Sequence, residues 1–352
     1  MKPFKGIVKL LALVLGLVLL AAAGLAGYLS LTEYRPAAQE TLRITPAALE
    51  EVPAVGDRLT VVTFNTGYAG LDRTQDFVMD GGKRARPGSE EEVRSNMAAM
   101  LGALDSMGAQ IVLLQEVDTD ASRTFHTDQA DYYRRGLAMN AAMAYNYKCE
   151  FVPFPWPPIG KVQSGLVTLT QLDVTGAERI SLPVPFSWPL RIANLKRCLL
   201  VERVPVEETE KELVIINLHL EAYDDGTGRE AQLKQLLGLM EAELNKGNYV
   251  IAGGDFNATF PDLPAMPAVE PDGWQPQNLP EMPEGFSYVC DAASPSCRSL
   301  SRPYSGNRSD TQFYIIDGFI ISDNLKVNHV ETVDLNFRNS DHNPVLMQVT
   351  LQ

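Results

Sequence analysis

Residues 249–257 read YVIAGGDFN, an apolar run that ends in an acid and an amide. The run predicts a strand, and Asp255 and Asn257 come at its end. In an open α/β sheet, the carboxyl ends of the strands border the crevice in which ligands bind. We therefore expect both side chains to face such a crevice. An Asx turn is the alternative interpretation of this pair.

Other predicted strands end in polar groups of the same kind. The ends are TVVTFN at Asn65, IVLLQE at Glu116, VIINLH at His219 and YIID at Asp317, and the segment NSDHNPV adds Asp341 and His342. Taken alone, each has an ordinary explanation, such as a turn, a salt-bridged strand end or a satisfied core histidine. Together they place carboxylates, amides and imidazoles at the ends of predicted strands. Coincidence does not explain so many groups of this kind in the same position.

These strand ends form an ordered set of short motifs. The set is FN (64–65), LQE (114–116), NLHL (217–220), GGDFN (253–257), ID (316–317) and SDH (340–342). It resembles the endonuclease/exonuclease/phosphatase superfamily, in the family's order, over residues 59–352. That superfamily holds metal-dependent phosphodiesterases and phosphatases, including DNase I-like nucleases, abasic-site endonucleases, neutral sphingomyelinases and inositol polyphosphate 5-phosphatases. The resemblance implies a four-layered α/β sandwich of two mixed β-sheets flanked by helices.

The resemblance and the chemistry of phosphoester hydrolysis assign the same metal ligands. Hydrolysis needs an activated water, neutralised phosphate oxygens and help for the leaving group. Mg²⁺ prefers carboxylate, amide and water oxygens. We therefore expect Glu116 and Asn65 to bind Mg²⁺, with Asp341 as a further ligand, direct or through water. Mn²⁺ is an alternative ion.

The remaining motif residues are expected to act on the substrate. Asp255 would activate or orient the attacking water, and Asn257 would donate a hydrogen bond to the scissile phosphate. His342, as an imidazolium, would stabilise the transition state, and Asp317 would hold its tautomer and raise its pKa. His219 occupies the position of a second histidine in DNase-like and sphingomyelinase-like members and would protonate the leaving oxygen. Abasic-site endonucleases usually carry a tyrosine there.

Helical patterns separate the predicted strands. Capping boxes predict helix starts at Ser89 with Glu92 and at Thr227 with Glu230. Apolar residues at helical spacing follow each start. Other strand-like runs follow one another without a helix between them. This alternation independently indicates a layered α/β domain, which we assign to residues 58–352.

The N-terminal residues 1–31 predict a membrane anchor. The run from Leu10 to Leu31 carries no charge, and about 20 apolar residues suffice to cross a bilayer. Lys2, Lys5 and Lys9 precede the run, so the positive-inside rule places the N-terminus in the cytoplasm and the catalytic domain outside the cell. A cleaved signal peptide, and hence a secreted protein, is the alternative.

Residues 32–57 are predicted to form a polar linker that could include a short helix. Residues 261–283 contain seven prolines and predict a long surface loop. Cys290 and Cys297 bracket a short loop, and a disulfide and two free thiols are both compatible with the spacing. His126 and His329 lie outside the motifs and are interpreted as surface residues.

The substrate is less well defined by the sequence. A net charge of −14 disfavours loose binding of polyanions, although metal ions or a local basic patch would permit it. The loop GGKRARPG (81–88) is either solvated or contacts a substrate anion. The loops FVPFPWPPIG (151–160) and VPFSWPL (184–190) either pack on the domain or form a rim that touches lipid or stacks on a ring.

Several functions remain open at this point. A lipid headgroup, a nucleic acid and a small phosphodiester are all candidate substrates for hydrolysis at the outer membrane face. An extracellular DNase I-like endonuclease and an inactive binding module that kept the fold are the alternatives. No obligate protein partner is indicated.

Overall fold

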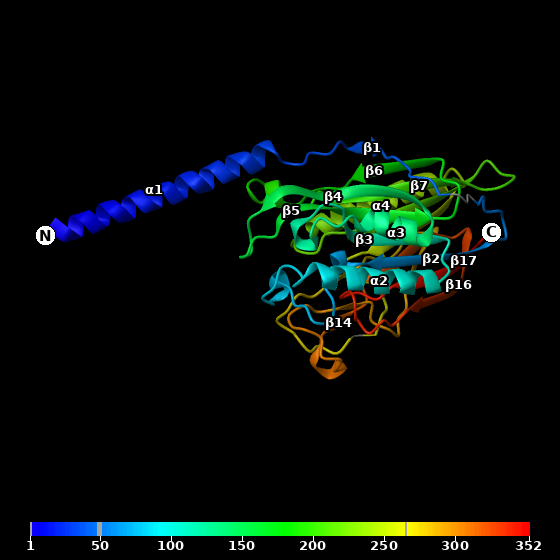
Figure 1. The fold of residues 1–352 in the computed structure, drawn as a ribbon. Coiled ribbons are helices and arrows are strands. Elements are labelled where there is room, and N and C mark those ends of the chain that lie inside the picture. The colour runs from blue at the N-terminus through cyan, green and yellow to red at the C-terminus, as the bar shows by residue number, and fades with distance from the viewer. Residues whose placement is uncertain (1, 48–50, 265) are drawn as a thin grey trace.

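Two β-sheets packed face to face form the body of the protein, and helices cover their outer faces (Figure 1). The computed structural model describes residues 2–47, 51–264 and 266–352. The seven-stranded sheet contains, in spatial order, β1 (Gln39–Thr41), β6 (Gly176–Ser181), β7 (Cys198–Pro205), β8 (Glu212–His219), β9 (Tyr249–Asp255), β15 (Asp317–Ser322) and β12 (Phe286–Val289). The six-stranded sheet contains β16 (Leu325–Thr332), β17 (Val345–Leu351), β2 (Arg58–Asn65), β3 (Ile111–Asp118), β5 (Gly160–Thr170) and β4 (Asn140–Val152).

Short elements complete the described chain. Two small strand pairs are β10 (Ala258–Thr259) with β11 (Gln277–Asn278) and β13 (Cys297–Arg298) with β14 (Phe313–Tyr314). The helices are α1 (Lys2–Leu31), α2 (Glu90–Ser106), α3 (Gln129–Leu137) and α4 (Thr227–Leu244). The 3₁₀ turns are η1 (Gly67–Ala69), η2 (Val78–Asp80), η3 (Ser122–Thr124), η4 (Leu190–Ala193) and η5 (Arg308–Asp310).

The helices cover the sandwich from both sides. Met97 of α2 and Tyr133 of α3 pack against the outer face of the six-stranded sheet. Leu236 and Met240 of α4 pack against the outer face of the seven-stranded sheet. The structure therefore confirms the predicted fold class, a four-layered sandwich of two mixed sheets flanked by helices, with one apolar helix at the N-terminus.

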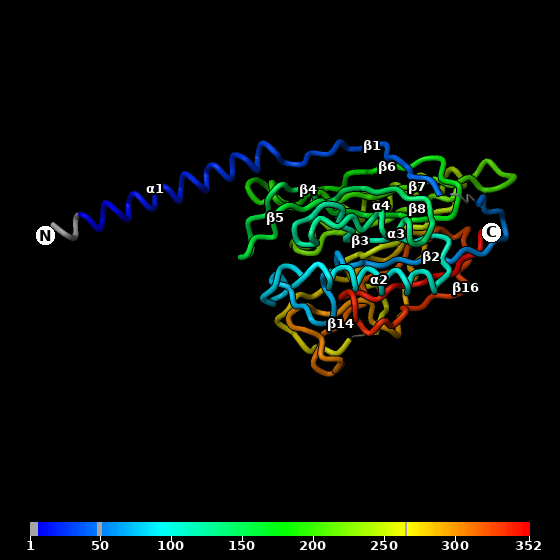
Figure 2. The backbone as a smooth tube through the Cα atoms, in the orientation of Figure 1, coloured from blue at the N-terminus to red at the C-terminus, as the bar shows by residue number. Residues whose placement is uncertain are grey.

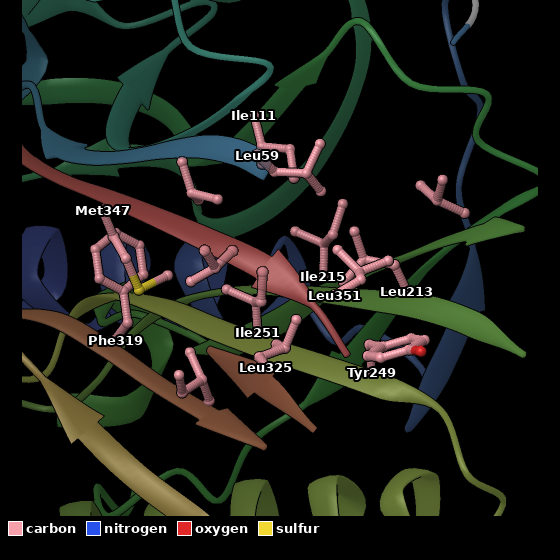
Figure 3. Close-up of a cluster of buried hydrophobic side chains, with 14 of the residues drawn as sticks. Leu59, Ile111, Leu213, Ile215, Tyr249, Ile251, Phe319, Leu325, Met347 and Leu351 are labelled. Carbon is pink, nitrogen blue, oxygen red and sulfur yellow. The ribbon is translucent and has the colours of Figure 1, made fainter. Parts of the chain in front are cut away.

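The centre of the sandwich is an apolar cluster between the two sheets (Figure 3). Ile111 and Met347 reach it from the six-stranded sheet, and Ile215, Ile251 and Phe319 from the seven-stranded sheet, all at 0% exposure. Successive side chains of a strand point to opposite faces, so alternate residues enter the cluster. Truncating one such isoleucine to alanine typically costs about 2–5 kcal/mol. The cluster therefore gives the strand ends a rigid support.

Each sheet contains two parallel neighbouring strands joined by a helix. β2 leads through α2 to β3, and β8 leads through α4 to β9. Parallel strands end at the same edge of a sheet, so Asn65 lies beside Gln115, the residue before Glu116, and His219 beside Asp255. The two edges face each other, because Nδ2 of Asn65 donates a 3.0 Å hydrogen bond to Oδ2 of Asp255.

The two predicted helix starts differ in outcome. Oγ of Ser89 accepts a hydrogen bond from the backbone N–H of Glu92, as the first capping box predicts. The second capping box is wrong, because Thr227 is the first residue of α4 and its hydroxyl donates to Asp225. The carboxylate of Asp224 caps this helix instead, accepting a 2.5 Å hydrogen bond from the N–H of Gly228.

α1 extends away from the sandwich as a long rod (Figures 1 and 2). Its segment Gly6–Leu31 has 26 residues and a mean hydropathy of 2.6, so it is long and apolar enough to cross a membrane. A membrane anchor and a signal sequence both have these properties, so the two predicted alternatives stay open.

Segment 32–57 was predicted to be a linker, but part of it is paired with the domain. Its strand β1 pairs antiparallel with β6, and Thr45 bridges to Ala141. The described part of the segment contains no helix, and residues 48–50 lie outside the described residues. An edge strand exposes unpaired backbone N–H and C=O groups, which an extended chain can satisfy. The segment is therefore an added edge of the sandwich.

Three smaller predictions concern residues away from the strand ends. The described part of residues 261–283 contains only the short strand β11 and is otherwise an irregular loop. His126 and His329 are exposed, as expected. Cys290 and Cys297 are free thiols. Of the two predicted alternatives, the structure therefore has the free thiols and not the disulfide.

Candidate active site

A β-bulge directs Glu116 toward the space between the sheet edges. Gln115 and Glu116 of β3 lie opposite the single residue Leu166 of β5. Glu116 has a φ of 55°, in the left-handed region that residues other than glycine rarely adopt. If the side chains of β3 kept alternating between the two faces of the sheet, that of Glu116 would point to the outer face, under α2. The extra residue re-aims it, as bulges near functional sites often do.

Asp255 lies between the facing edges of the two sheets and contacts residues from both. Its Oδ2 accepts the hydrogen bond from Asn65 and lies 3.5 Å from Nε2 of His219 and 3.7 Å from Nε2 of His342. Its Oδ1 accepts a 2.9 Å hydrogen bond from the N–H of Asn257. Four of the predicted site residues therefore surround one buried carboxylate.

Asp317 and His342 form the pair that the sequence predicts. Nδ1 of His342 lies 2.8 Å from Oδ2 of Asp317, and both side chains are buried. The same carboxylate oxygen accepts a 2.7 Å hydrogen bond from the hydroxyl of Ser296. Backbone register helps to place this pair, because Asp317 at the start of β15 lies opposite Asp255 at the end of β9.

The segment before β17 brings Asp341 and His342 to the same place. β17 pairs antiparallel with β2, so the residues just before it lie beside the end of β2. The hydroxyl of Ser340 donates a 2.9 Å hydrogen bond to the carbonyl oxygen of Asn65. Gly67 lies against Asp341, and a Cβ there would meet Oδ1 at 2.8 Å. The close approach and the φ of +51° both require glycine at this position.

Asn257 follows β9 in the left-handed conformation, with a φ of 48°. Its Nδ2 donates a 2.9 Å hydrogen bond to the carbonyl oxygen of Leu220, which fixes the amide plane. The amide nitrogen carries two hydrogens. One is used in this contact, and the second is available to a substrate oxygen.

The carboxyl groups have raised pKa values. Burial, together with the charge of Asp341, raises the pKa of Glu116 to about 7. Burial, together with the charge of Asp317, raises the pKa of Asp255 to about 6. Burial likewise raises the pKa of Asp341. These acids are close together and poorly hydrated, so their ionised forms are destabilised.

The two histidines have opposite shifts. Burial, together with the charges of Arg197 and His342, lowers the pKa of His219 well below its usual range. Burial acts to lower the pKa of His342, but the charges of Asp317, Cys297 and Asp341, with the hydrogen bond to Asp317, together outweigh it, and the pKa lies well above the usual range. His342 is therefore an imidazolium and His219 a neutral ring. This disfavours the expected role of His219 as a charged proton donor.

One cavity of about 770 Å³ collects these groups. Its lining includes seven of the eight predicted site residues: Asn65, Glu116, His219, Asp255, Asn257, Asp341 and His342. Asp317 lies behind His342 and contacts it. The sequence therefore identified the residues that the fold brings together, while their catalytic and metal-binding roles stay predictions.

The donor groups fit a divalent cation. Glu116, Asp341 and Asn65 present carboxylate and amide oxygens, which Mg²⁺ prefers. Burial is the main cause of the raised pKa values of the two acids, and a bound cation would stabilise their ionised forms. Among the described residues, two clusters bring ligand atoms within 4.8 Å of one another: Asp255 with Asp317 and His342, and Cys297 with Asp341 and His342. Both include His342, whose Nδ1 is already in hydrogen-bond contact with Asp317, so we favour the oxygen donors.

Several supporting residues were not predicted. Nε2 of Gln115 donates a 2.8 Å hydrogen bond to Oδ1 of Asn217, joining the two sheets directly behind the site. Both residues lie in the quoted motifs LQE and NLHL, so an amide inside an apolar strand was an available signal. Ser296 and Ser340 hold site residues through their hydroxyls, and of the two only Ser340 lies in a quoted motif, SDH.

Three arginines that line the cavity were also missed. Arg123 makes hydrogen bonds of 2.8 and 2.9 Å to the carboxylate of Asp118. Arg197 lies 3.6 Å from Glu221 and donates to the carbonyl oxygen of His219. Arg298 donates to backbone carbonyl oxygens. No local sequence pattern marks these residues. The basic loop 81–88, in contrast, is not part of the cavity lining, and its Lys83, Arg84 and Arg86 are exposed.

Comparisons with known proteins agree with this geometry. The model of the Endonuclease/Exonuclease/phosphatase family matches residues 62–342. No protein among the curated sequences matches the chain. The structure of an endonuclease/exonuclease/phosphatase from Beutenbergia cavernae has 18% identity and a TM-score of 0.56, and the match covers 84% of this chain and 72% of that one.

Two further solved structures are similar. ANGEL2, described as a 2′,3′-cyclic phosphatase in complex with adenosine-2′,3′-vanadate, has 13% identity and a TM-score of 0.55 over 88% of this chain and 98% of its own. TDP2 from Caenorhabditis elegans has 14% identity and a TM-score of 0.51 over 84% of this chain and 74% of its own. At such identities the likeness shows the fold.

Proposed function

This chain belongs to the endonuclease/exonuclease/phosphatase family, whose members hydrolyse phosphoesters, and on that premise we propose that it is a Mg²⁺-dependent phosphodiesterase or phosphatase. Mn²⁺ is the alternative ion. The observation that carries the proposal is the convergence of the facing strand edges on one buried carboxylate, Asp255, beside an imidazolium.

Asp255 is suited to orient the attacking water. Its raised pKa of about 6 leaves it ionised at neutral pH, yet close enough to that pH to accept a proton. Asn65 and the N–H of Asn257 hold the carboxylate in a fixed position through hydrogen bonds of 3.0 and 2.9 Å. A fixed base within reach of a water contributes typically about 10²–10⁴-fold to the rate.

His342 is suited to stabilise the negative charge that develops on phosphorus oxygens. Asp317 holds Nδ1, so Nε2–H points toward Asp255 and Asp341, at 3.7 and 3.9 Å from their nearest oxygens. A buried, preorganised cation of this kind stabilises a transition state without reorganisation. Asn257 and the neutral ring of His219 add hydrogen bonds to the phosphate and the leaving oxygen.

Glu116 and Asp341, with Asn65, would hold the metal ion. When bound, Mg²⁺ would polarise the phosphate and neutralise part of its charge. The chain contributes the excess of buried negative charge that attracts the ion, and the β-bulge that aims Glu116 at it.

We place this activity outside the cytoplasm, at the membrane. The support is the apolar segment Gly6–Leu31, which is long enough to span a bilayer, with the three lysines before Leu10. Sealed inside-out membrane vesicles test the orientation. The domain should resist added protease until detergent opens the vesicles, and digestion without detergent would place it in the cytoplasm.

The catalytic proposal is tested with the purified full-length chain in detergent micelles. Bis(4-nitrophenyl) phosphate and 4-nitrophenyl phosphate are supplied with Mg²⁺, with Mn²⁺ or with EDTA. We expect metal-dependent release of nitrophenol, and a loss of at least about 10²-fold in Asp255→Asn. Asp323→Asn, an exposed acid elsewhere, is the matched control and should behave as the wild type. Full activity in EDTA, or in Asp255→Asn, would contradict the mechanism. An absence of hydrolysis on every substrate would favour a binding module.

A further inference from the structure

The cavity does not end at the catalytic residues. From them, which we call its polar end, it continues to a wall formed by Ala22, Leu25, Ala26 and Leu29 of α1. These positions follow the i, i+3, i+4, i+7 spacing of one helix face. The same helix contains Gly6–Leu31, the segment that is long and apolar enough to cross a membrane. One wall of the cavity is therefore the C-terminal end of this helix, which the proposed function places at the outer face of the membrane.

The end of α1 is fastened to the domain at this wall. Oγ of Ser30 accepts a 3.1 Å hydrogen bond from Nε1 of Trp188. Just after the helix, Glu33 pairs with Arg191 at 2.9 Å and lies 3.5 Å from Lys196. The side chain of Glu33 is only 2% exposed. These contacts hold the loop before β7 against the helix and fix the position of the wall.

Two loops form the rest of this part of the cavity. Phe154, between β4 and β5, and Phe186 and Leu190, before β7, line it together with Pro153, Pro155 and Ile192. We call this region, with the α1 face, the apolar end. Two of its lining residues are strongly exposed, Phe154 at 62% and Leu190 at 68%. The same two loops carry the exposed Trp156 (87%) and Trp188 (60%), which lie outside the cavity lining. Tryptophans with one apolar side favour the membrane–water interface.

The cations beside the cavity do not favour a nucleic acid. Proteins that bind a phosphate backbone use free lysine and arginine side chains. Of the three arginines that line this cavity, Arg123 and Arg197 face the carboxylates of Asp118 and Glu221. Arg298 donates to backbone carbonyls and its Nε has no hydrogen-bond partner, so the lining offers one cation for a single phosphate rather than a row of them for a phosphate backbone. The apolar end offers aliphatic and aromatic carbon instead. A ligand that fills both ends must carry a phosphoester at one end and an apolar chain at the other.

We propose that the substrate is a membrane phospholipid, which enters from the outer leaflet beside α1 with its phosphodiester at the polar end and its apolar chains at the apolar end. This inference rests on the proposed function. The volume of about 770 Å³ lies within the usual range for small-molecule sites, about 300–1,000 Å³. In the reaction, the oxygen of water joins phosphorus, one P–O ester bond breaks, and a proton of that water ends on the leaving alcohol.

The test uses the full-length chain reconstituted in vesicles. Separate vesicles contain phosphatidylethanolamine, phosphatidylglycerol, phosphatidylcholine, phosphatidylinositol or sphingomyelin, and bis(4-nitrophenyl) phosphate and plasmid DNA are offered in parallel. We expect hydrolysis of at least one phospholipid. The double variant Phe154→Glu/Leu190→Glu should lower the ratio of phospholipid to aryl diester turnover at least tenfold. Both side chains are exposed, so the variant should fold, and α1 still anchors it. Val55→Glu, an exposed position away from the cavity, should leave the ratio unchanged.

The outcomes separate the two proposals. Hydrolysis of the aryl diester or of DNA with every phospholipid intact overturns the lipid inference and leaves the proposed function in place. An unchanged ratio in the double variant also overturns the lipid inference. If no substrate is hydrolysed, both proposals fail.

Discussion

The polar and apolar ends of the cavity are built from different parts of the fold. The polar end is made of strand termini backed by the packed core, and its side chains are buried and joined by hydrogen bonds. The apolar end is made of a helix face and two loops, and its rim side chains are mostly exposed. On our proposals, the rigid part would carry the chemistry, which needs fixed distances, and the exposed part would contact the membrane.

The difference predicts different responses to substitution. Changes at the polar end should affect turnover of every phosphoester, because they act on the reacting group. Changes at the apolar end should affect only substrates with an apolar chain. The predictions below probe this division, beginning with the largest effect.

The largest effect is expected for His342→Gln. The variant removes the buried imidazolium, and we expect kcat on bis(4-nitrophenyl) phosphate to fall roughly 10³-fold with a small change in KM. His329→Gln, an exposed histidine, is the matched control and should be unaffected. Steady-state kinetics measure both. A variant that kept a tenth of the wild-type kcat would place the chemistry elsewhere.

Asp317→Asn should lower kcat less, by about 10²-fold, because the carboxylate acts through His342 as a positioning residue. The double variant with His342→Gln separates this role from a merely structural one. If Asp317 acts through the ring, the double variant should be no slower than His342→Gln alone. Independent, multiplying losses would show that the two residues act separately.

Glu116→Gln should weaken the metal site. The Mg²⁺ concentration for half-maximal activity should rise tenfold or more, with activity partly restored at saturating metal. Metal titrations of the aryl diester reaction measure this. The same titration in Glu202→Gln, a buried acid at 1% exposure outside the cavity lining, is the control. An unchanged metal requirement in Glu116→Gln would remove this residue from the ligand set.

The smallest effect is expected at the junction with α1. Burial alone would raise the pKa of Glu33, but hydrogen bonds from Arg191 and Arg35 and the charge of Lys196 lower it below 4.5. A lowered pKa in the folded state stabilises the fold above pH 4.5, and the contribution is lost as the pH falls through the folded value. Glu33→Gln should therefore lose about 0.5–1 kcal/mol of unfolding free energy at pH 7.

That difference should shrink as the pH is lowered below 4.5. Thermal unfolding in micelles at several pH values follows it. A difference between wild type and Glu33→Gln that persists unchanged at low pH would mean that the ionised pair does not stabilise the junction.

The polar end could be predicted from the sequence to a large extent. Six of the eight site residues stand at the end of an apolar run, and Asp341 and His342 stand just before one. Strand ends of a layered sheet meet at shared edges. The β-bulge at Glu116 could not be predicted, because it depends on one residue of mismatch between β3 and β5. Nor could the neutral state of His219, which follows from burial by residues distant in sequence.

The apolar end could not be assembled from the sequence. The Pro- and aromatic-rich loops and the apolar helix could each be recognised in the sequence. No local pattern predicts that the end of α1 packs against these loops. Their meeting depends on single tertiary contacts, such as Trp188 with Ser30 and Arg191 with Glu33. The edge strand β1, which ties the predicted linker to the sandwich, was missed for the same reason.

The most direct test of the central claim, a single metal-dependent phosphoester site at the facing strand edges, is the location of a bound ion. Crystals of the full-length chain grown with Mn²⁺ would show it by anomalous scattering. The account predicts a peak at bonding distance from the carboxylate of Glu116, within the cavity that Asp255 and His342 line. A cavity without such a peak at saturating Mn²⁺, or an ion held only outside it, would contradict the account.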